Sequence, residues 1–256
     1  MVRVSNHLRP FAPAPRVAAI LAVLASCYAV LAVLVAHGTF TRFDQFLIDH
    51  LMIRFKPSPQ GSEGYSGLYK PFGAHTPTSA RILDVLTYPC SALISLLVVA
   101  GFALAVRRRV GWIVAVAPAA AWVVGNVVEK IGKHWLYRPH LTMTSGGVPI
   151  HVIGYDNSFP SGHMMRCLIV GLCVVLLWRR ATPWVIAWAA LVGHALVVED
   201  SHTVTDVIGG ALVGAMLVLL LRAPLVSLLS GSGTDTTDRS YPSPWGRTET
   251  APRIRT

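Results

Sequence analysis

The chain has 256 residues, of which 53% are hydrophobic and only 13% are charged, and its mean hydropathy is +0.54. These values exclude an ordinary soluble globular domain. The formal net charge of +10 does not imply a nucleic-acid partner, because membrane proteins collect basic residues on one side of the bilayer.

Six apolar runs approach the roughly 20 residues that a helix needs to span a bilayer. We therefore expect an all-α integral membrane bundle of six transmembrane helices. Two of the runs are short, so their ends are expected to lie in a cleft or at the membrane interface. In chain order the runs are 17–36, 88–106, 111–128, 163–178, 183–198 and 204–221, and the fourth and fifth are the short ones.

The polar segments divide the chain into three parts. Residues 1–16 form a basic leader, and the first apolar run lacks a small-residue cleavage site, so it is interpreted as a retained helix rather than a signal peptide. Residues 17–229 are expected to form one six-helix membrane domain with a long outer loop at 38–87. Residues 230–256 are rich in Ser, Thr, Gly, Pro and Arg and are predicted to be a disordered cytoplasmic tail.

The arginines indicate how the chain is oriented. Six spans place both termini on one side, and the segments on that side carry most of the arginines and only three acids, Asp235, Asp238 and Glu249. This is the positive-inside pattern. We expect a multi-pass protein of the plasma membrane with both termini cytoplasmic. The arginines on that side are Arg3, Arg9, Arg16, Arg107, Arg108, Arg109, Arg179, Arg180, Arg222, Arg239, Arg247, Arg253 and Arg255.

The outer loop begins with an amphipathic segment at 42–51. Its apolar residues at 43, 46, 47 and 51 follow helical spacing, and acidic residues lie on the opposite face. We expect a helix that lies on the membrane surface. Farther along the chain, the Pro/Gly/Ser-rich piece at 57–67 is expected to be irregular, and a Gly/Pro loop is expected at 144–157.

The tetrapeptide Pro160-Ser161-Gly162-His163 opens the fourth apolar run. Proline suits the first turn of a helix, serine is a favoured cap, and glycine lets a ligand approach the backbone. The N–H groups of Ser161 and Gly162 would then form an anion site at the helix N-terminus. An ordinary capped helix start is the alternative interpretation. Phe159 before the tetrapeptide and the membrane helix after it favour a binding role.

His202 and Asp206 lie four residues apart at the start of the last run, and so share a helix face. A carboxylate in this position holds the imidazole by one nitrogen and leaves the other for nucleophilic attack. The alternative is a polar pair that caps a helix near the interface. The presence of both the His202–Asp206 pair and the Pro-Ser-Gly-His segment favours chemistry on a phosphate ester.

Basic residues follow the third apolar run on the same outer side. Lys130, Lys133, His134 and Arg138 either contact lipid phosphates or hold a phosphate substrate. Because they oppose the positive-inside tendency on this side, the second interpretation is favoured.

These segments together resemble the type 2 phosphatidic acid phosphatase superfamily, which shares its core with the vanadium haloperoxidases. The superfamily has three motifs: Lys, six residues, Arg-Pro; then Pro-Ser-Gly-His; then Ser-Arg, five residues, His, three residues, Asp. The second motif matches in full at residues 160–163, and His202 and Asp206 match the end of the third. The resemblance covers residues 88–221, and residues 17–36 match as a first span.

The first motif departs from the superfamily pattern by a shifted lysine. Arg138-Pro139 is in place, but the residue seven positions before Arg138 is Ile131. Lys130 comes one position too early and Lys133 two positions late. Either lysine is a candidate to bind the phosphate, and Lys130 is favoured.

The third motif departs by a missing arginine. The expected Ser-Arg falls on Ala195-Leu196. Arg166, three residues after His163, is the candidate replacement, since an arginine inside a membrane span is functional by default. The alternatives are that Arg166 pairs with Glu199 or Asp200, or that it snorkels at a subunit contact.

The resemblance implies a mechanism. Arg138, a motif lysine and the backbone N–H groups at 161–163 would hold the phosphate oxygens. His202 would attack phosphorus while Asp206 orients its ring. His163 would protonate the leaving alkoxide and then activate water. Cations and the helix dipole would neutralise the transition state, so that no metal is required.

The remaining cysteines and histidines add no predicted metal or cofactor site. Cys27, Cys90, Cys167 and Cys173 lie in or beside apolar runs without metal-ligand spacing. His75, His140 and His151 lie in loops and have no evident partner in the sequence.

The predicted function is a metal-independent phosphatase for a lipid phosphate or polyprenyl diphosphate. It acts through a phosphohistidine at the outer membrane face, and its partners are the bilayer and the lipid substrate. The alternative is a noncatalytic membrane subunit or lipid-phosphate-binding protein with a degraded site, which Leu196 and the shifted lysine favour. A small transporter is a weaker alternative. The sequence leaves open a homo-oligomer or a partner in a membrane complex.

Overall fold

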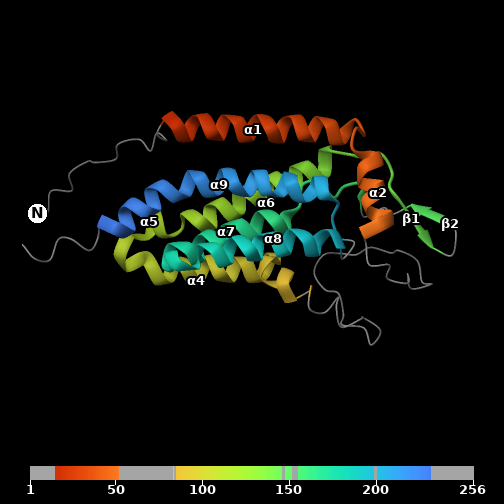
Figure 1. Ribbon diagram of the computed structural model, residues 1–256. Coiled ribbons are helices and arrows are strands. Elements are labelled where there is room, and N and C mark those ends of the chain that lie inside the picture. The colour runs from red at the N-terminus through yellow and green to blue at the C-terminus, as the bar shows by residue number, and fades with distance from the viewer. Residues whose placement is uncertain are drawn as a thin grey trace, which may run out of the picture.

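The structure is a computed structural model that describes residues 15–51, 83, 85–145, 148–151, 155–198 and 201–231. Within these residues, long helices run along a common axis and form an all-α bundle (Figure 1). They correspond one to one with the predicted apolar runs, so the predicted fold class is confirmed. The long helices are α1 (Pro15–Ala36), α4 (Ala92–Val110), α6 (Ala117–Trp135), α7 (Gly162–Leu177), α8 (Thr182–Val198) and α9 (Val204–Gly231).

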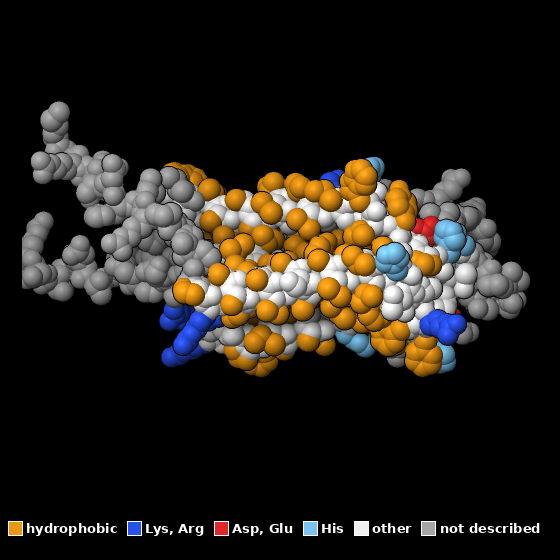
Figure 2. Space-filling view, turned by 90° about the horizontal axis from the view of Figure 1, so that it is seen from above, with side chains coloured by type: hydrophobic (Ala, Val, Ile, Leu, Met, Phe, Trp, Pro, Cys, Tyr) orange, Lys and Arg blue, Asp and Glu red, His pale blue; other side chains and the backbone are white. Residues whose placement is uncertain are grey.

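The surface of the bundle is apolar along its length, as expected for a membrane domain. Among the residues that the structure describes, three helical segments, at 15–36, 179–198 and 204–222, are long and apolar enough to cross a bilayer, and α7 is a shorter apolar helix. Hydrophobic side chains cover the visible face of the bundle, and a group of Lys and Arg side chains lies at its left end (Figure 2). The number of helices that cross the membrane stays a prediction.

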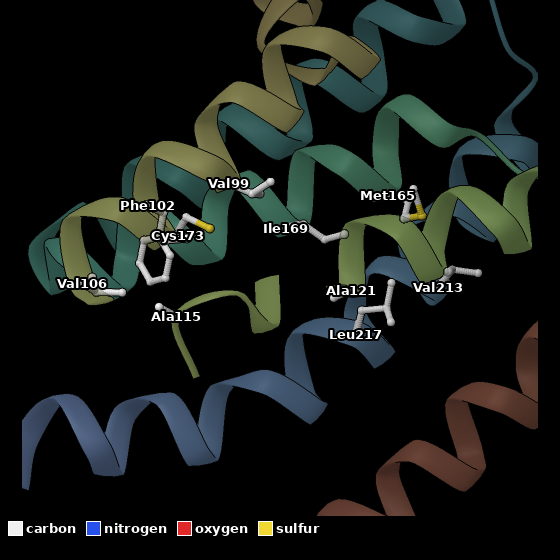
Figure 3. Close-up of a cluster of buried hydrophobic side chains, with 11 residues drawn as sticks. Val99, Phe102, Val106, Ala115, Ala121, Met165, Ile169, Cys173, Val213 and Leu217 are labelled. Atoms are coloured by element: carbon white, nitrogen blue, oxygen red, sulfur yellow. The ribbon is translucent and has the colours of Figure 1, made fainter. Parts of the chain in front are cut away.

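Helix α7 is the central helix of the bundle. It packs against α4, α6, α8 and α9, and most of its side chains are buried. Met165, Ile169 and Cys173 of α7 meet Val99 of α4 and Leu217 of α9 in the main apolar core (Figure 3). Because α7 is enclosed by other helices, the position of its N-terminus is fixed by packing from all sides.

Two element boundaries differ from the prediction. The second run begins with a 3-10 turn, η1 (Tyr88–Cys90), before α4 starts at Ala92. The third run is divided into α5 (Trp112–Ala115) and α6 (Ala117–Trp135). Pro118 lies in the first turn of α6, where its missing N–H is tolerated, whereas within a continuous helix it would remove a hydrogen bond. A further 3-10 turn, η3 (Arg179–Ala181), connects α7 and α8.

A small β-hairpin replaces part of the predicted Gly/Pro loop. Strand β1 (Thr142–Ser145) pairs antiparallel with β2 (Val148–His151), with Thr142 opposite His151. The β-branched residues in these strands favour extended backbone, and the Gly/Pro signal concealed them. The piece at 57–67, the leader, most of the outer loop and the tail from 232 onward lie outside the described residues.

Helix α2 (Thr41–Leu51) lies across the end of the bundle at which α7 and α9 begin, beside the hairpin (Figure 1). The predicted helix is therefore present, but its two acidic residues do not share one exposed face. Phe43 and Phe46 are exposed, whereas Asp44 is buried together with Ile48. Of the two acidic residues in α2, only Asp49 is exposed.

Candidate active site

The N-terminus of α7 has the local structure that its sequence predicts. Ser161 is the N-cap, and its side-chain oxygen accepts a hydrogen bond from the backbone N–H of Met164. The Ser161 N–H donates to the backbone carbonyl of Asp206 at 2.9 Å. A Cβ on Gly210 would overlap the Ser161 carbonyl oxygen. The first turns of α7 and α9 are therefore in direct backbone contact.

The two motif histidines lie next to each other at this junction. The ring centroids of His163 and His202 are 6.2 Å apart, with the rings tilted by 59°. His202 is buried, with 6% of its surface exposed, and His163 is partly exposed. This separation allows both rings to reach one tetrahedral anion.

Asp206 lies beside His202, the candidate nucleophile. It is fully buried, and one of its oxygens lies 3.6 Å from Nδ1 of His202. The same oxygen accepts a hydrogen bond of 3.0 Å from the backbone N–H of Thr203. The backbone N–H of His202 donates to the Leu196 carbonyl at the end of α8, at 3.0 Å. Nδ1 of His202 therefore faces Asp206, although no hydrogen bond forms at this distance. Nε2 is the candidate attacking atom.

Arg138 joins Asp206 to the rest of the site. Its side chain is 5% exposed. Its terminal nitrogens donate to the hydroxyls of Thr203 and Thr205 at 2.8 and 2.7 Å. They also lie 3.2 Å from Asp206 and 3.4 Å from Asp44. Two buried carboxylates therefore compensate the charge of this guanidinium.

Asp44 is a residue of this network that the sequence pattern did not reveal. It is 2% exposed and accepts a hydrogen bond of 2.7 Å from the Thr205 hydroxyl. Burial raises the pKa of its carboxyl, and the Thr205 hydrogen bond and the Arg138 charge oppose that shift. The turn at Gly38, whose φ is 72° and whose missing Cβ makes room for Pro139, brings α2 over Arg138.

A second charged cluster lies near the α7 N-terminus. Arg166 is 5% exposed and donates to Glu129 and Asn126, each at 2.8 Å, and to the Cys90 carbonyl at 2.8 Å. Lys133 forms an ion pair of 2.7 Å with the other oxygen of Glu129. An ion pair between Glu129 and Lys133 could have been predicted from the sequence, because Glu129 lies four residues before Lys133 on a helix.

Glu129 lies directly against the Pro-Ser-Gly-His turn. A Cβ on Gly162 would overlap the Glu129 carboxylate, so the glycine leaves room for this carboxylate against the backbone. The two candidate lysines differ in their surroundings. Lys133 pairs with Glu129 and is partly buried, whereas Lys130 is exposed. Both lysines line an open surface groove with His134 and Trp135. Glu199 and Asp200, the alternative partners of Arg166, lie outside the described residues.

The chain is similar in sequence to known proteins. Residues 109–225 match the sequence profile of the PAP2 superfamily. The predicted resemblance to this superfamily is confirmed over these residues, which are somewhat less than half of the chain. The bacitracin transport permease protein BcrC of Bacillus licheniformis is 32% identical over 115 residues, which are 43% of this chain and 55% of that protein. The chain therefore spans only about half the length of this relative.

The bundle also matches a solved PAP2 structure. This is the first transmembrane PAP2 type phosphatidylglycerolphosphate phosphatase from Bacillus subtilis, with a TM-score of 0.58 and 17% sequence identity. The match covers 79% of this chain and 94% of that protein. The fold is therefore that of a membrane-integral PAP2 protein.

At the position of the missing PAP2 arginine, the structure has an apolar contact. Leu196 is 2% exposed and belongs to the packed cluster that contains Cys90 and Met164. Arg166 approaches the same region from α7, because its Nε donates to the Cys90 carbonyl. The two side chains thus reach the same part of the bundle from different helices.

Proposed function

We propose that this protein is a phosphatase that removes phosphate from a membrane lipid phosphate or a polyprenyl diphosphate. The observation that carries the proposal is the 6.2 Å separation of the His163 and His202 rings at the N-terminus of α7, with Asp206 beside His202. The PAP2 fold and the apolar surface of the bundle support a lipid as the substrate class.

The reaction has two displacements at phosphorus. Nε2 of His202 attacks phosphorus, and the bond between phosphorus and the leaving oxygen breaks while His163 donates a proton to that oxygen. The Asp206 carboxylate stabilises the imidazolium that forms. His163 then takes a proton from water, whose oxygen attacks the phosphohistidine and releases phosphate and free His202.

We assign the phosphate oxygens to positive groups near the α7 N-terminus. Since the Ser161 N–H donates to Asp206, the N–H groups from Gly162 onward are the backbone ligands that we assign. The side chains that we assign are Arg138, beside Asp206, and Arg166 with Lys133, beside Glu129. We assign Lys133 rather than Lys130 as the motif lysine, because Lys133 already binds an anion at this turn.

The decisive experiment is phosphate release by the purified protein from a panel of lipid phosphates, including phosphatidate, phosphatidylglycerol phosphate and a polyprenyl diphosphate. His202→Ala is the blank, and vanadate, which mimics five-coordinate phosphorus, is expected to inhibit the parent. Equal release by the parent and by His202→Ala would refute the proposal.

The rival function is a noncatalytic lipid-phosphate-binding protein. Leu196 in place of an arginine and the pairing of both Lys133 and Arg166 with Glu129 favour it. It predicts that lipid phosphates bind to the purified protein and are recovered unchanged after prolonged incubation. Turnover that depends on His202 excludes this function.

Arg166 is proposed as the replacement for the missing arginine. Arg166→Ala is then expected to lower turnover by a factor on the order of 10²–10³, as for the loss of one transition-state donor. Adding Leu196→Arg to that variant is expected to restore part of the activity. Arg222→Ala, at the far end of α9, is the control. Unchanged turnover in Arg166→Ala would refute this role.

We further propose that the site faces the outer side of the plasma membrane, with both termini cytoplasmic. The arginine-rich ends of α4 and α7 support this orientation, because they lie at the end of the bundle opposite to the histidines.

A further inference from the structure

Three metal-ligating side chains from separate segments meet outside the proposed active site. His140 follows Arg138-Pro139, His151 ends strand β2, and Asp156 precedes the Pro-Ser-Gly-His segment. Nδ1 of His140 and Nε2 of His151 lie 3.3 and 2.9 Å from the same oxygen of Asp156. The ring centroids of the two histidines are 4.1 Å apart. Neither histidine has an evident partner in the sequence, because the hairpin that brings them together was not predicted.

The donor set is that of a transition-metal site. All three ligand atoms lie within 4.8 Å of one another. Tetrahedral Zn²⁺ with bonds of about 2.0–2.1 Å places its ligand atoms roughly 3.4 Å apart, so small side-chain rotations suffice. Imidazole nitrogen and carboxylate oxygen are both ordinary zinc ligands.

The exposure of the cluster suits a site with an open coordination position. The His140 side chain is 72% exposed, while that of Asp156 is 17% exposed. An ion held by these three ligands would be reached from the solvent side and would complete its coordination with water. We propose that His140, His151 and Asp156 form a binding site for one divalent transition-metal ion, with Zn²⁺ as the best-matched ion.

The position of the cluster defines what the ion would do. The backbone N–H of Arg138 donates to the Asp156 carbonyl at 3.2 Å. On β1, the backbone N–H of Thr142 donates to the Gln45 side chain of α2 at 2.9 Å. The ion would therefore cross-link strand β2 and the turn at Asp156 to the segment that carries Arg138 and His140. It takes no part in phosphoryl transfer, and its binding does not depend on the proposed function.

The test is metal binding by the full chain, purified with an affinity tag that contains no histidine and stripped with a chelator. Titration calorimetry with Zn²⁺ is expected to give one ion per chain, and Co²⁺ is expected to give the visible absorption of a low-symmetry site. His140→Ala and His151→Ala are each expected to weaken binding by more than about 100-fold, beyond the loss typical of an outer hydrogen bond. His37→Ala, outside the cluster, is the matched control.

Thermal unfolding separates loss of the site from loss of the fold. In the presence of chelator, the two variants are expected to unfold near the temperature of the parent. Added Zn²⁺ is expected to raise that temperature in the parent and in His37→Ala, but not in the cluster variants, because a ligand stabilises only the state that binds it. Absence of stoichiometric binding by the parent would overturn the proposal. Unchanged binding in both cluster variants would do the same.

Discussion

At the level of individual residues, Asp206 connects the two halves of the candidate site. It contacts His202 on one side and Arg138 on the other, and it is fully buried. Burial of a carboxylate is tolerated only when charges or hydrogen bonds compensate it. Arg138 therefore helps to compensate the buried charge of Asp206 beside His202, in addition to its proposed contact with phosphate.

Asp44 gives a prediction about pH. Because the pKa of its carboxyl is raised in the folded protein, the folded state binds this proton more tightly than the unfolded state. The carboxyl therefore contributes stability that is present at low pH and is lost as the pH rises through the raised pKa. Asp44→Asn removes this titration. The difference in unfolding temperature between Asp44→Asn and the parent is measured from about pH 4 to pH 7. We expect this difference to increase in favour of Asp44→Asn as the pH rises.

Asp49→Asn is the control for this measurement, since Asp49 is exposed on the same helix. Its difference from the parent is expected to stay constant over the same range. If the advantage of Asp44→Asn shrinks as the pH rises, the pairing of Asp44 with Arg138 outweighs its burial.

Glu129 gives a prediction about anion binding. Its carboxylate lies against Gly162 and pairs with both Lys133 and Arg166, so it occupies cations that the proposed mechanism assigns to phosphate. Glu129→Gln keeps the shape of the side chain and removes its charge. Vanadate, measured by titration calorimetry, is expected to bind about tenfold more tightly, which corresponds to about 1.4 kcal/mol. Weaker vanadate binding would mean that Glu129 holds the two cations in place rather than competing for them.

The sequence revealed His163, His202, Asp206 and Arg138 because each lies in a short motif with fixed spacing. Asp44 was not found, because its partner Thr205 lies 161 residues away and helical periodicity placed it on the polar outer face. The sequence could not decide between Lys130 and Lys133, because neither lies at the motif position, 131, and each step along a helix turns a side chain by about 100°.

At the level of helices and strands, apolar runs predicted the existence and order of the six long helices well. Their ends were less certain, because the helix break before α6 depends on one proline and the hairpin was concealed by Gly and Pro. The contact between α7 and α9 was not predictable at all. It depends on small residues that let two backbones approach, as is common between membrane helices.

This contact gives a prediction for Gly210. A Cβ there would overlap the Ser161 carbonyl oxygen, which belongs to the backbone and cannot rotate away. Gly210→Ala is expected to separate the starts of α7 and α9, to destabilise the fold by about 1–3 kcal/mol, and to reduce turnover strongly. Unfolding temperature and phosphate release report the two effects. Gly101→Ala in α4 meets no neighbour within 4 Å and is expected to be neutral or slightly stabilising. Equal behaviour of the two variants would contradict the close contact.

For the whole molecule, the two ends of the bundle differ in chemistry. Helices α7 and α9 begin at the end that carries α2 and the hairpin (Figure 1). Arg107, Arg108 and Arg109 end α4, and Arg179 and Arg180 follow α7, at the opposite end. The positive-inside rule places such arginines in the cytoplasm. The histidines would then lie at the outer surface, within reach of lipid phosphates in the outer leaflet.

The orientation can be tested with single cysteines in a background in which the exposed Cys27 is replaced by serine. Tyr137 is 61% exposed beside the site, and Arg180 is exposed at the opposite end. In intact cells, a membrane-impermeant maleimide is expected to label Tyr137→Cys and not Arg180→Cys, and both are expected to be labelled after permeabilisation. The reverse pattern would place the histidines on the cytoplasmic side. The substrate would then have to be a lipid phosphate of the inner leaflet, because the charged headgroup of a lipid reaches only the site that opens on its own side of the bilayer.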